Sequence, residues 1–346
     1  MPWYYIVPLG ISDMFCPHML PESVMSQAAS SQTVSSLNKM PLDVTAIAEK
    51  LAVVRNEINT AFIGRDHVVR LALAAILARG HVLIEDAPGS GKTALSRALA
   101  TCLGLDFKRI QCTNDLLPAD ITGMSVFDAK TSAFTFRQGP VFTQMLLADE
   151  LNRAPSRTQS SLLEAMEERR VTIDRDTLDL PEPFLVVATQ NPREFIGTFD
   201  LPESQLDRFA VSMSIGRPDK DIQKQILNGM SAGKSPDQVR VMADPETLIS
   251  WQHTAAGITV DDAILGYIID LSDAIEAEGH ASLSVRYRNQ LLRLAQASAL
   301  IDSRDFTLPE DVQAMLYPSL RHRMTRIDPT QRKAAVSAAV AGVTLP

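Results

Sequence analysis

The stretch that decides the fold runs from Ile84 to Thr93 and reads Ile-Glu-Asp-Ala-Pro-Gly-Ser-Gly-Lys-Thr. The apolar run just before it predicts a buried strand, and the apolar spacing in residues 93–100 predicts a helix just after it. A glycine-bearing turn between a strand and a helix directs backbone N–H groups and the positive end of the helix dipole at one point, where phosphates bind. We therefore expect a phosphate-binding loop in which Lys92 reaches the β- and γ-phosphates of a nucleotide and the Thr93 hydroxyl holds Mg²⁺.

One residue of this loop departs from the usual pattern G-x-x-x-x-G-K-[ST], because Asp86 stands where the first glycine is expected. A carboxylate beside a polyphosphate repels it unless the side chain points away or pairs with a cation. If Asp86 closes the strand just outside the cradle, the residues that follow still form it. We expect the cradle to consist of Ala87, Pro88, Gly89, Ser90, Gly91, Lys92, Thr93 and Ala94.

Length and composition are those of an ordinary soluble globular protein. The 346 residues leave room for two domains, and 45% of them are hydrophobic and 21% charged. The net charge of −8 argues against nucleic acid as the default partner, because nucleic-acid binding usually leaves a basic footprint. No apolar run approaches the ~18 residues that a membrane-spanning helix needs. We therefore expect a cytoplasmic protein without a membrane span.

The chain start and the cysteines add little to this picture. Residues 1–40 are rich in Ser, Met and Pro and lack an early positive cluster, so they predict a disordered tail or an over-extended start rather than a secretory signal. Cys16, Cys102 and Cys112 lack the paired spacing of a metal site, and the last two lie in apolar surroundings. We expect structural core thiols in a reducing compartment.

Strand patterns alternate with helix patterns through the first two thirds of the chain. The expected strands are residues 81–84, 107–112, 145–148, 185–189 and 211–215. This alternation predicts an α/β fold with a doubly wound parallel sheet and a ligand at the carboxyl ends of the strands. Residues 116–140 interrupt it and predict a short inserted hairpin.

Only amphipathic helices are expected after Arg217, including residues 261–277 and 286–301. We place a boundary near Gly216, between an α/β nucleotide-binding domain at residues 41–216 and a smaller all-helical domain at residues 217–346. Two capping boxes are predicted, Ser156 with Gln159 and Thr307 with Glu310, each at the start of a helix.

Polar side chains follow two of the expected strands. The strand at 145–148 runs directly into Asp149 and Glu150. At the carboxyl end of a strand, Asp149 is placed to share Mg²⁺ with Thr93, and Glu150 to polarise the water that attacks the γ-phosphate. Asn191 follows the next strand and is a candidate for orienting the same water, although an asparagine before proline is also an ordinary turn residue.

Two arginines are candidates for stabilising charge on the γ-phosphate. Arg208 follows a short helix begun at Pro202, and Arg286 opens a helix of the second domain behind Ser284. A guanidinium on the transferring phosphate can contribute roughly 10³–10⁵ in rate. One arginine near a helix end is more often a surface ion pair, so sequence alone leaves both readings open.

Taken together, these motifs resemble the AAA+ ATPases, and more closely the MoxR family. The segments that carry the resemblance are residues 89–93, 147–155, 158–167, 188–192, 201–209 and 320–323. It covers about residues 43–326, and its most specific block is 147–167. The resemblance implies a P-loop NTPase fold with a helical lid, a helix-2 insert at 116–140 and a pre-sensor-1 hairpin at 171–178.

The same resemblance implies roles for individual residues. Asp149 and Glu150 match the Walker B positions, Asn191 matches sensor 1, Arg208 the arginine finger and Arg286 the sensor 2 arginine. Acidic variants at the position of Asp86 are compatible with the family, so what Asp86 puts in doubt is tight nucleotide binding.

The implied assembly is a hexameric ring with ATP and Mg²⁺ between subunits, where Arg208 would act on the neighbour's nucleotide. Members of the family typically work with von Willebrand factor A-domain proteins, as chaperone-like remodellers in the maturation of a client protein or in metal insertion. Nothing in the sequence names the client.

Two other classes of function compete with this interpretation. Arginines concentrated at residues 286–293 and 321–326 motivate a nucleic-acid motor or loader, which salt-sensitive DNA binding would support. A nucleotide-gated scaffold that barely hydrolyses ATP is the other alternative. The presence of Asp149, Glu150 and Asn191 argues against the scaffold.

Overall fold

The computed structural model describes residues 43–87, 89–130, 132–173, 176–190, 201–217, 219–228 and 233–346, without the side chains of residues 225–227. All of these ranges belong to one compact unit, Asp43–Pro346.

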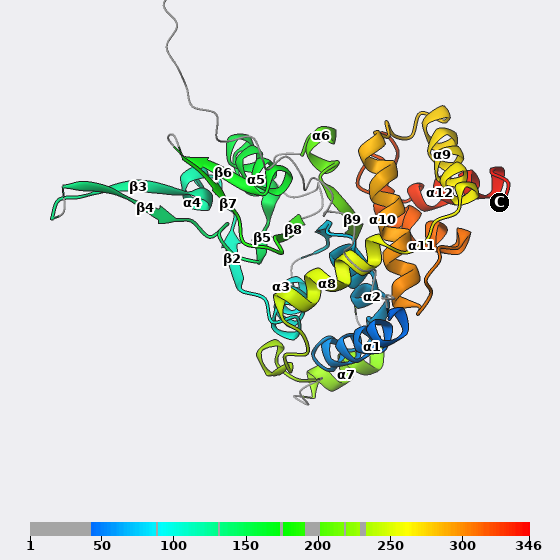
Figure 1. Cartoon of the computed structure of the whole chain (residues 1–346), viewed down its shortest axis with the longest axis horizontal. Helices are drawn as coiled ribbons and strands as arrows, with labels where there is room; N and C mark the ends of the chain where they lie inside the picture. The colour runs from blue at the N-terminus through cyan, green and yellow to red at the C-terminus, as the bar shows by residue number, and fades with distance from the viewer. Residues whose placement is uncertain are drawn as a thin grey trace, which may run out of the picture. The chain divides into compact units, whose positions relative to one another are not determined.

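A parallel sheet forms the centre of this unit. Five strands of the described chain lie in the order β2-β5-β8-β1-β9 (Figure 1). Their bounds are His81–Glu85 for β1, Phe107–Gln111 for β2, Met145–Asp149 for β5, Leu185–Gln190 for β8 and Phe209–Met213 for β9. All pairings are parallel, so every strand ends at the same edge. The predicted α/β fold with a parallel sheet is confirmed.

Helices cover both faces of the sheet, which explains why its strands are apolar runs rather than alternating patterns. Val82 and Ile84 of β1 pack in one buried cluster with helices α1 (Val44–Ala61), α2 (Asp66–Leu77) and α3 (Lys92–Cys102). Leu83, between them, packs in a second cluster with α5 (Ser156–Glu168). Cys102 and Cys112 lie one in each cluster, and burial raises the pKa of each thiol to about 12. The expectation that these two cysteines are core thiols is confirmed.

Two hairpins extend from this core. The first is formed by β3 (Gly123–Asp128) and β4 (Ala133–Gln138) after the short helix α4 (Pro118–Thr122), and Figure 1 shows it reaching away from the sheet. The second is formed by β6 (Arg170–Ile173) and β7 (Asp176–Asp179). The inserted hairpin predicted within residues 116–140 is therefore present.

In the described chain after β9, the elements are helices and one short helical turn (Pro236–Gln238), shown in light green to red in Figure 1. They are α7 (Lys220–Leu227), α8 (Pro245–Ala256), α9 (Asp262–Ala277), α10 (Val285–Ile301), α11 (Pro309–Leu320) and α12 (Arg332–Gly342). Helix α10 packs on α2, and α11 packs on β9. An all-helical part follows the sheet as predicted, and the boundary near Gly216 stays a prediction. No helix among the described residues is long and apolar enough to cross a membrane.

The predicted helix starts were wrong in detail. The N-cap of α5 is Pro155, and Gln159 instead donates to the backbone carbonyl of Ala154 at 3.0 Å. Helix α11 begins at Pro309, and Asp311 accepts a hydrogen bond from the backbone N–H of Leu308 at 2.9 Å. Pro309 occupies the first turn of α11, where its φ fits, and Pro155 is itself the residue that precedes the first turn of α5.

Glu57 of α1 is a buried carboxylate that ties the sheet's helices to the segment before α8. Its side chain is 4% exposed, and it accepts hydrogen bonds from Lys234 Nζ at 2.6 Å and from the backbone N–H of Arg240 at 2.9 Å. The hydrogen bond from Lys234 is the largest cause that lowers the pKa of Glu57 from 4.5 to about 2. Because the folded-state pKa lies below the unfolded one, this carboxylate stabilises the fold above about pH 4.5 and stops doing so as the pH falls toward 2.

We predict that Glu57→Gln lowers the free energy of unfolding at pH 7 by about 2 kcal/mol, because it leaves Lys234 without its charged partner. The difference from the wild type should shrink as the pH falls from about 4.5 toward 2. Urea unfolding across this range measures both effects. Glu49→Gln, an exposed change on the same helix, is the control, and an equal loss in that variant would contradict the assignment.

Candidate active site

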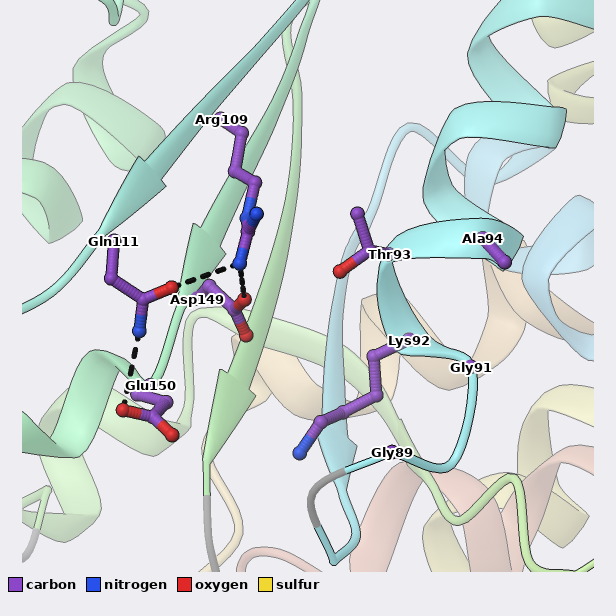
Figure 2. Close-up of a pocket in the computed structure, with 9 residues that line it drawn as sticks. All are labelled: Gly89, Gly91, Lys92, Thr93, Ala94, Arg109, Gln111, Asp149 and Glu150. Carbon is purple, nitrogen blue, oxygen red and sulfur yellow. Dashed lines mark hydrogen bonds and ion pairs between the residues drawn. The ribbon is translucent and has the colours of Figure 1, made fainter. Parts of the chain in front are cut away.

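The loop after β1 opens onto a cavity of about 450 Å³ at the carboxyl edge of the sheet. Its lining residues are Gly89, Gly91, Lys92, Thr93, Ala94, Arg109, Gln111, Asp149 and Glu150 (Figure 2). Gly89 and Gly91 have φ of 79° and 99°, in the left-handed region that favours glycine. Gly91 caps helix α3 without any side-chain hydrogen bond, so backbone N–H groups of the first turn remain for an anion.

Lys92 is the buried cation of this cavity. Lys92 is 7% exposed, and its Nζ donates a hydrogen bond to the backbone carbonyl of Asp86 at 2.7 Å. Burial lowers the pKa of Lys92, and nearby carboxylates, Asp149 first, oppose that shift. The hydroxyl of Ser90 in the same loop is buried without a hydrogen-bond partner among the described residues. A cationic cradle with unfilled donors fits a polyphosphate.

Asp86 points away from the cradle. Its Oδ2 accepts hydrogen bonds from the backbone N–H of Gly216 at 2.7 Å and from Ser214 Oγ at 3.1 Å. Arg65 lies beside it and donates to the carbonyl oxygens of Gly216 and Ser90 at 3.1 and 3.2 Å. The carboxylate therefore closes strand β1 just outside the loop, as the sequence allowed, and faces donors instead of the phosphate position.

Asp149 ends strand β5, Glu150 follows it, and both line the cavity opposite the loop (Figure 2). Thr189 of β8 fixes both: its Oγ1 donates to Asp149 Oδ1 at 2.6 Å and accepts from the Glu150 backbone N–H at 2.8 Å. Glu150 has φ of 57°, a left-handed conformation that costs a non-glycine residue about 1–3 kcal/mol. This turn places the second carboxylate at the cavity wall as well.

Arg109 and Gln111 of β2 also line the cavity, and the sequence analysis did not anticipate them. Arg109 Nη2 donates to Asp149 Oδ2 at 2.7 Å and to Gln111 Oε1 at 2.9 Å, and Gln111 Nε2 donates to Glu150 Oε2 at 3.2 Å (Figure 2). Residues 109 and 111 share one face of β2, and Gln111 lies in register with Asp149. Polar residues two apart at the end of an edge strand were the signal available in the sequence.

Arg208 and Arg286 lie together but away from this cavity. Arg208 Nη2 is 2.9 Å from Glu167 Oε2, and Arg286 pairs with the other oxygen of the same carboxylate. Arg208 directly precedes β9, at the amino edge of the sheet, while Lys92 follows the carboxyl end of β1. A five-residue strand spans about 16 Å, so the two edges are well separated.

The remaining expected positions are placed as follows. Asn191 and Pro88 lie outside the described residues. Thr93 and Ala94 line the cavity, whereas Ala87 and Ser90 belong to the loop without lining it.

The basic residues near the end of the chain are engaged in ion pairs. Arg288 pairs with Asp273 at 2.6 Å, Arg321 with Glu85 at 3.4 Å, and Arg326 with Glu203 at 3.6 Å. Arg323 is buried, with its Nε 2.9 Å from Asp207 Oδ1. The basic runs that suggested nucleic-acid binding thus contain several arginines whose charge is matched within the chain.

Comparison with known protein families agrees with this geometry. Residues 81–211 match the ATPase family associated with various cellular activities (AAA), and residues 273–341 match the AAA lid domain. A crystal structure of a protein from Cytophaga hutchinsonii assigned as an ATPase is similar with a TM-score of 0.78 and 33% identity, covering 88% of this chain and 97% of that one.

Three relatives extend the comparison. The YeaC protein of Bacillus subtilis is 43% identical over 77% of this chain and 84% of its own length. Chaperone MoxR1 of Mycobacterium tuberculosis is 36% identical over 78% of this chain and 74% of its own. Protein MoxR of Paracoccus denitrificans is 29% identical over 77% of this chain and 86% of its own length. With a parallel sheet, a phosphate loop facing two carboxylates and a helical lid, the chain belongs to the MoxR family of AAA ATPases.

Proposed function

We propose that this chain uses ATP hydrolysis to remodel a client protein in a chaperone-like way, as a subunit of a ring. The observation that carries the proposal is the division of the site between two edges of the sheet. The phosphate loop and both carboxylates lie at the carboxyl edge, while Arg208 and Arg286 lie at the amino edge. A complete site then needs the amino edge of a second copy.

Within one subunit, the proposed roles follow from position. Lys92 and the backbone N–H groups of residues 89–94 bind the β- and γ-phosphates. Thr93 and Asp149 hold Mg²⁺, which would supply charge neutralisation between the phosphates. Glu150, oriented by its left-handed backbone, accepts the proton of the attacking water. Asn191, which follows β8, is proposed to orient that water.

Glu167 has a proposed role of its own. In the single chain its carboxylate pairs with both Arg208 and Arg286 and offsets one of their two positive charges. Both arginine side chains are partly exposed, at 25% and 52%, so they remain accessible to an anion from outside. The γ-phosphate of a neighbouring subunit's nucleotide carries more charge than one carboxylate and would draw both guanidiniums across the subunit boundary.

The client-directed part of the proposal rests on family membership. A relative that carries the name chaperone, MoxR1 of Mycobacterium tuberculosis, supports a remodelling role. A hexameric ring, a von Willebrand factor A-domain partner, and protein maturation or metal insertion as the outcome are proposed on the same ground. The ion-paired arginines give no support to the alternative of a nucleic-acid motor.

We predict that Glu150→Gln keeps ATP binding and lowers kcat by about 10²–10⁴, because the attacking water loses its base. Fluorescent-nucleotide titration and steady-state ATPase assays measure the two effects. Glu164→Gln, an exposed change on α5, is the control and should behave as the wild type. Unchanged turnover in Glu150→Gln would refute its role. If turnover falls as predicted, the same variant, held with ATP, is suited to capture the client by affinity purification.

Action between subunits predicts complementation. Arg208→Ala and Lys92→Ala should each lose about 10³-fold in turnover, the first for lack of a donated guanidinium and the second for lack of phosphate binding. Mixed in one assembly, the Arg208→Ala pocket meets the intact arginine of a Lys92→Ala neighbour, and part of the activity should return. The control is a mixture of Arg157→Ala with Lys92→Ala. Arg157→Ala keeps Arg208, so this mixture measures how far inactive Lys92→Ala subunits lower the activity by dilution alone. Continued inactivity of the first mixture, in assemblies shown to contain both variants, would refute donation across the boundary.

A further inference from the structure

Arg109 lines the cavity and places a cation beside Asp149 when no nucleotide is bound. Its Nη2 lies 2.7 Å from Asp149 Oδ2, and Thr189 already donates to the other oxygen of that carboxylate at 2.6 Å. The Asp149 side chain is only 11% exposed, whereas the Arg109 side chain is 47% exposed. The carboxylate is thus fixed, and the guanidinium is the partner that has room to move.

The charges around the cavity show why this contact matters. Asp149 and Glu150 are adjacent carboxylates, and the backbone turn at Glu150 keeps both at the wall. Like charges close together repel, so each carboxylate is stabilised by a cation beside it. Arg109 offsets Asp149, and Arg153 offsets Glu150 with its Nη1 2.9 Å from Oε2.

We propose that Arg109 is a positioning residue that exchanges partners with the nucleotide: it pairs with Asp149 while the site is empty and transfers to the phosphates when Mg²⁺ takes Asp149. A guanidinium and a divalent cation repel each other on one carboxylate, so the arrival of the metal displaces the arginine. The phosphates enter the same cavity that Arg109 lines, and they accept its N–H groups there. This inference rests on the proposed Mg·ATP site.

The exchange makes two predictions of opposite sign for Arg109→Gln. Without nucleotide, Asp149 loses its resident cation, so Mn²⁺, used alone as a spectroscopic probe, should bind about tenfold more tightly than to the wild type. In EDTA, a fluorescent ATP analogue loses a phosphate partner and should bind about tenfold more weakly. Titration followed by Mn²⁺ electron paramagnetic resonance and by fluorescence measures the two affinities.

Two further variants separate this role from a general effect of charge. Arg153→Gln removes the same charge from the neighbouring carboxylate but leaves Asp149 paired, so its Mn²⁺ affinity should rise less than that of Arg109→Gln. Arg109→Lys retains the charge and a single donor to Asp149, so both affinities should stay near those of the wild type. If Arg109→Gln fails to fold, the two affinities are measured on Arg109→Lys instead.

The outcomes are distinct. Opposite shifts in Arg109→Gln support the exchange, while unchanged affinities, shifts in one direction, or equal Mn²⁺ shifts in Arg109→Gln and Arg153→Gln overturn it. If the wild type binds no ATP analogue in the presence of Mg²⁺, the proposed nucleotide site itself is refuted. If the wild type binds the ATP analogue in the presence of Mg²⁺, a failed prediction counts against the role of Arg109 and not against the nucleotide site.

Discussion

The parallel pairing of β1 with β8 and β9 is the constraint on which the rest of the structure depends. Because these strands run in one direction, every residue that follows a strand gathers at one edge and every residue that precedes a strand gathers at the other. The phosphate loop lies at the carboxyl edge, and Arg208 lies at the amino edge. This separation of the phosphate loop from Arg208 is the observation on which the proposed action between subunits rests.

Acidic side chains gather at the carboxyl edge of the sheet, and each has hydrogen-bond donors or a cation beside it. Asp86 turns to the backbone N–H of Gly216, and Glu85 accepts a hydrogen bond from Ser212 Oγ at 2.8 Å. Asp149 and Glu150 instead remain in the cavity and are offset by arginines from the flanking elements. A polyphosphate therefore meets a cradle in which the carboxylates either face away or are already matched by positive charge.

The sequence was sufficient for the elements whose signal is local. Continuous apolar strands and the loop ending at Lys92 predicted the sheet, and β5 ends at Asp149, where the apolar run had indicated the end of a strand. Helix caps were wrong by one residue, because Pro155 rather than Ser156 caps α5 and Leu308 rather than Thr307 caps α11. Arg109 was missed because a polar residue on an edge strand resembles a solvated face, and only the register with β5 brings it to Asp149.

The end of α11 connects the two edges. Arg321 reaches Glu85 at the carboxyl end of β1, whereas Arg323, two residues later, reaches Asp207 just before β9. The first contact is long, at 3.4 Å, and borders the phosphate loop. The second is buried, and breaking such a pair costs about 3–5 kcal/mol. The segment that follows α11 is therefore held at both edges of the sheet, and its buried contact is made to Asp207, the residue that precedes Arg208.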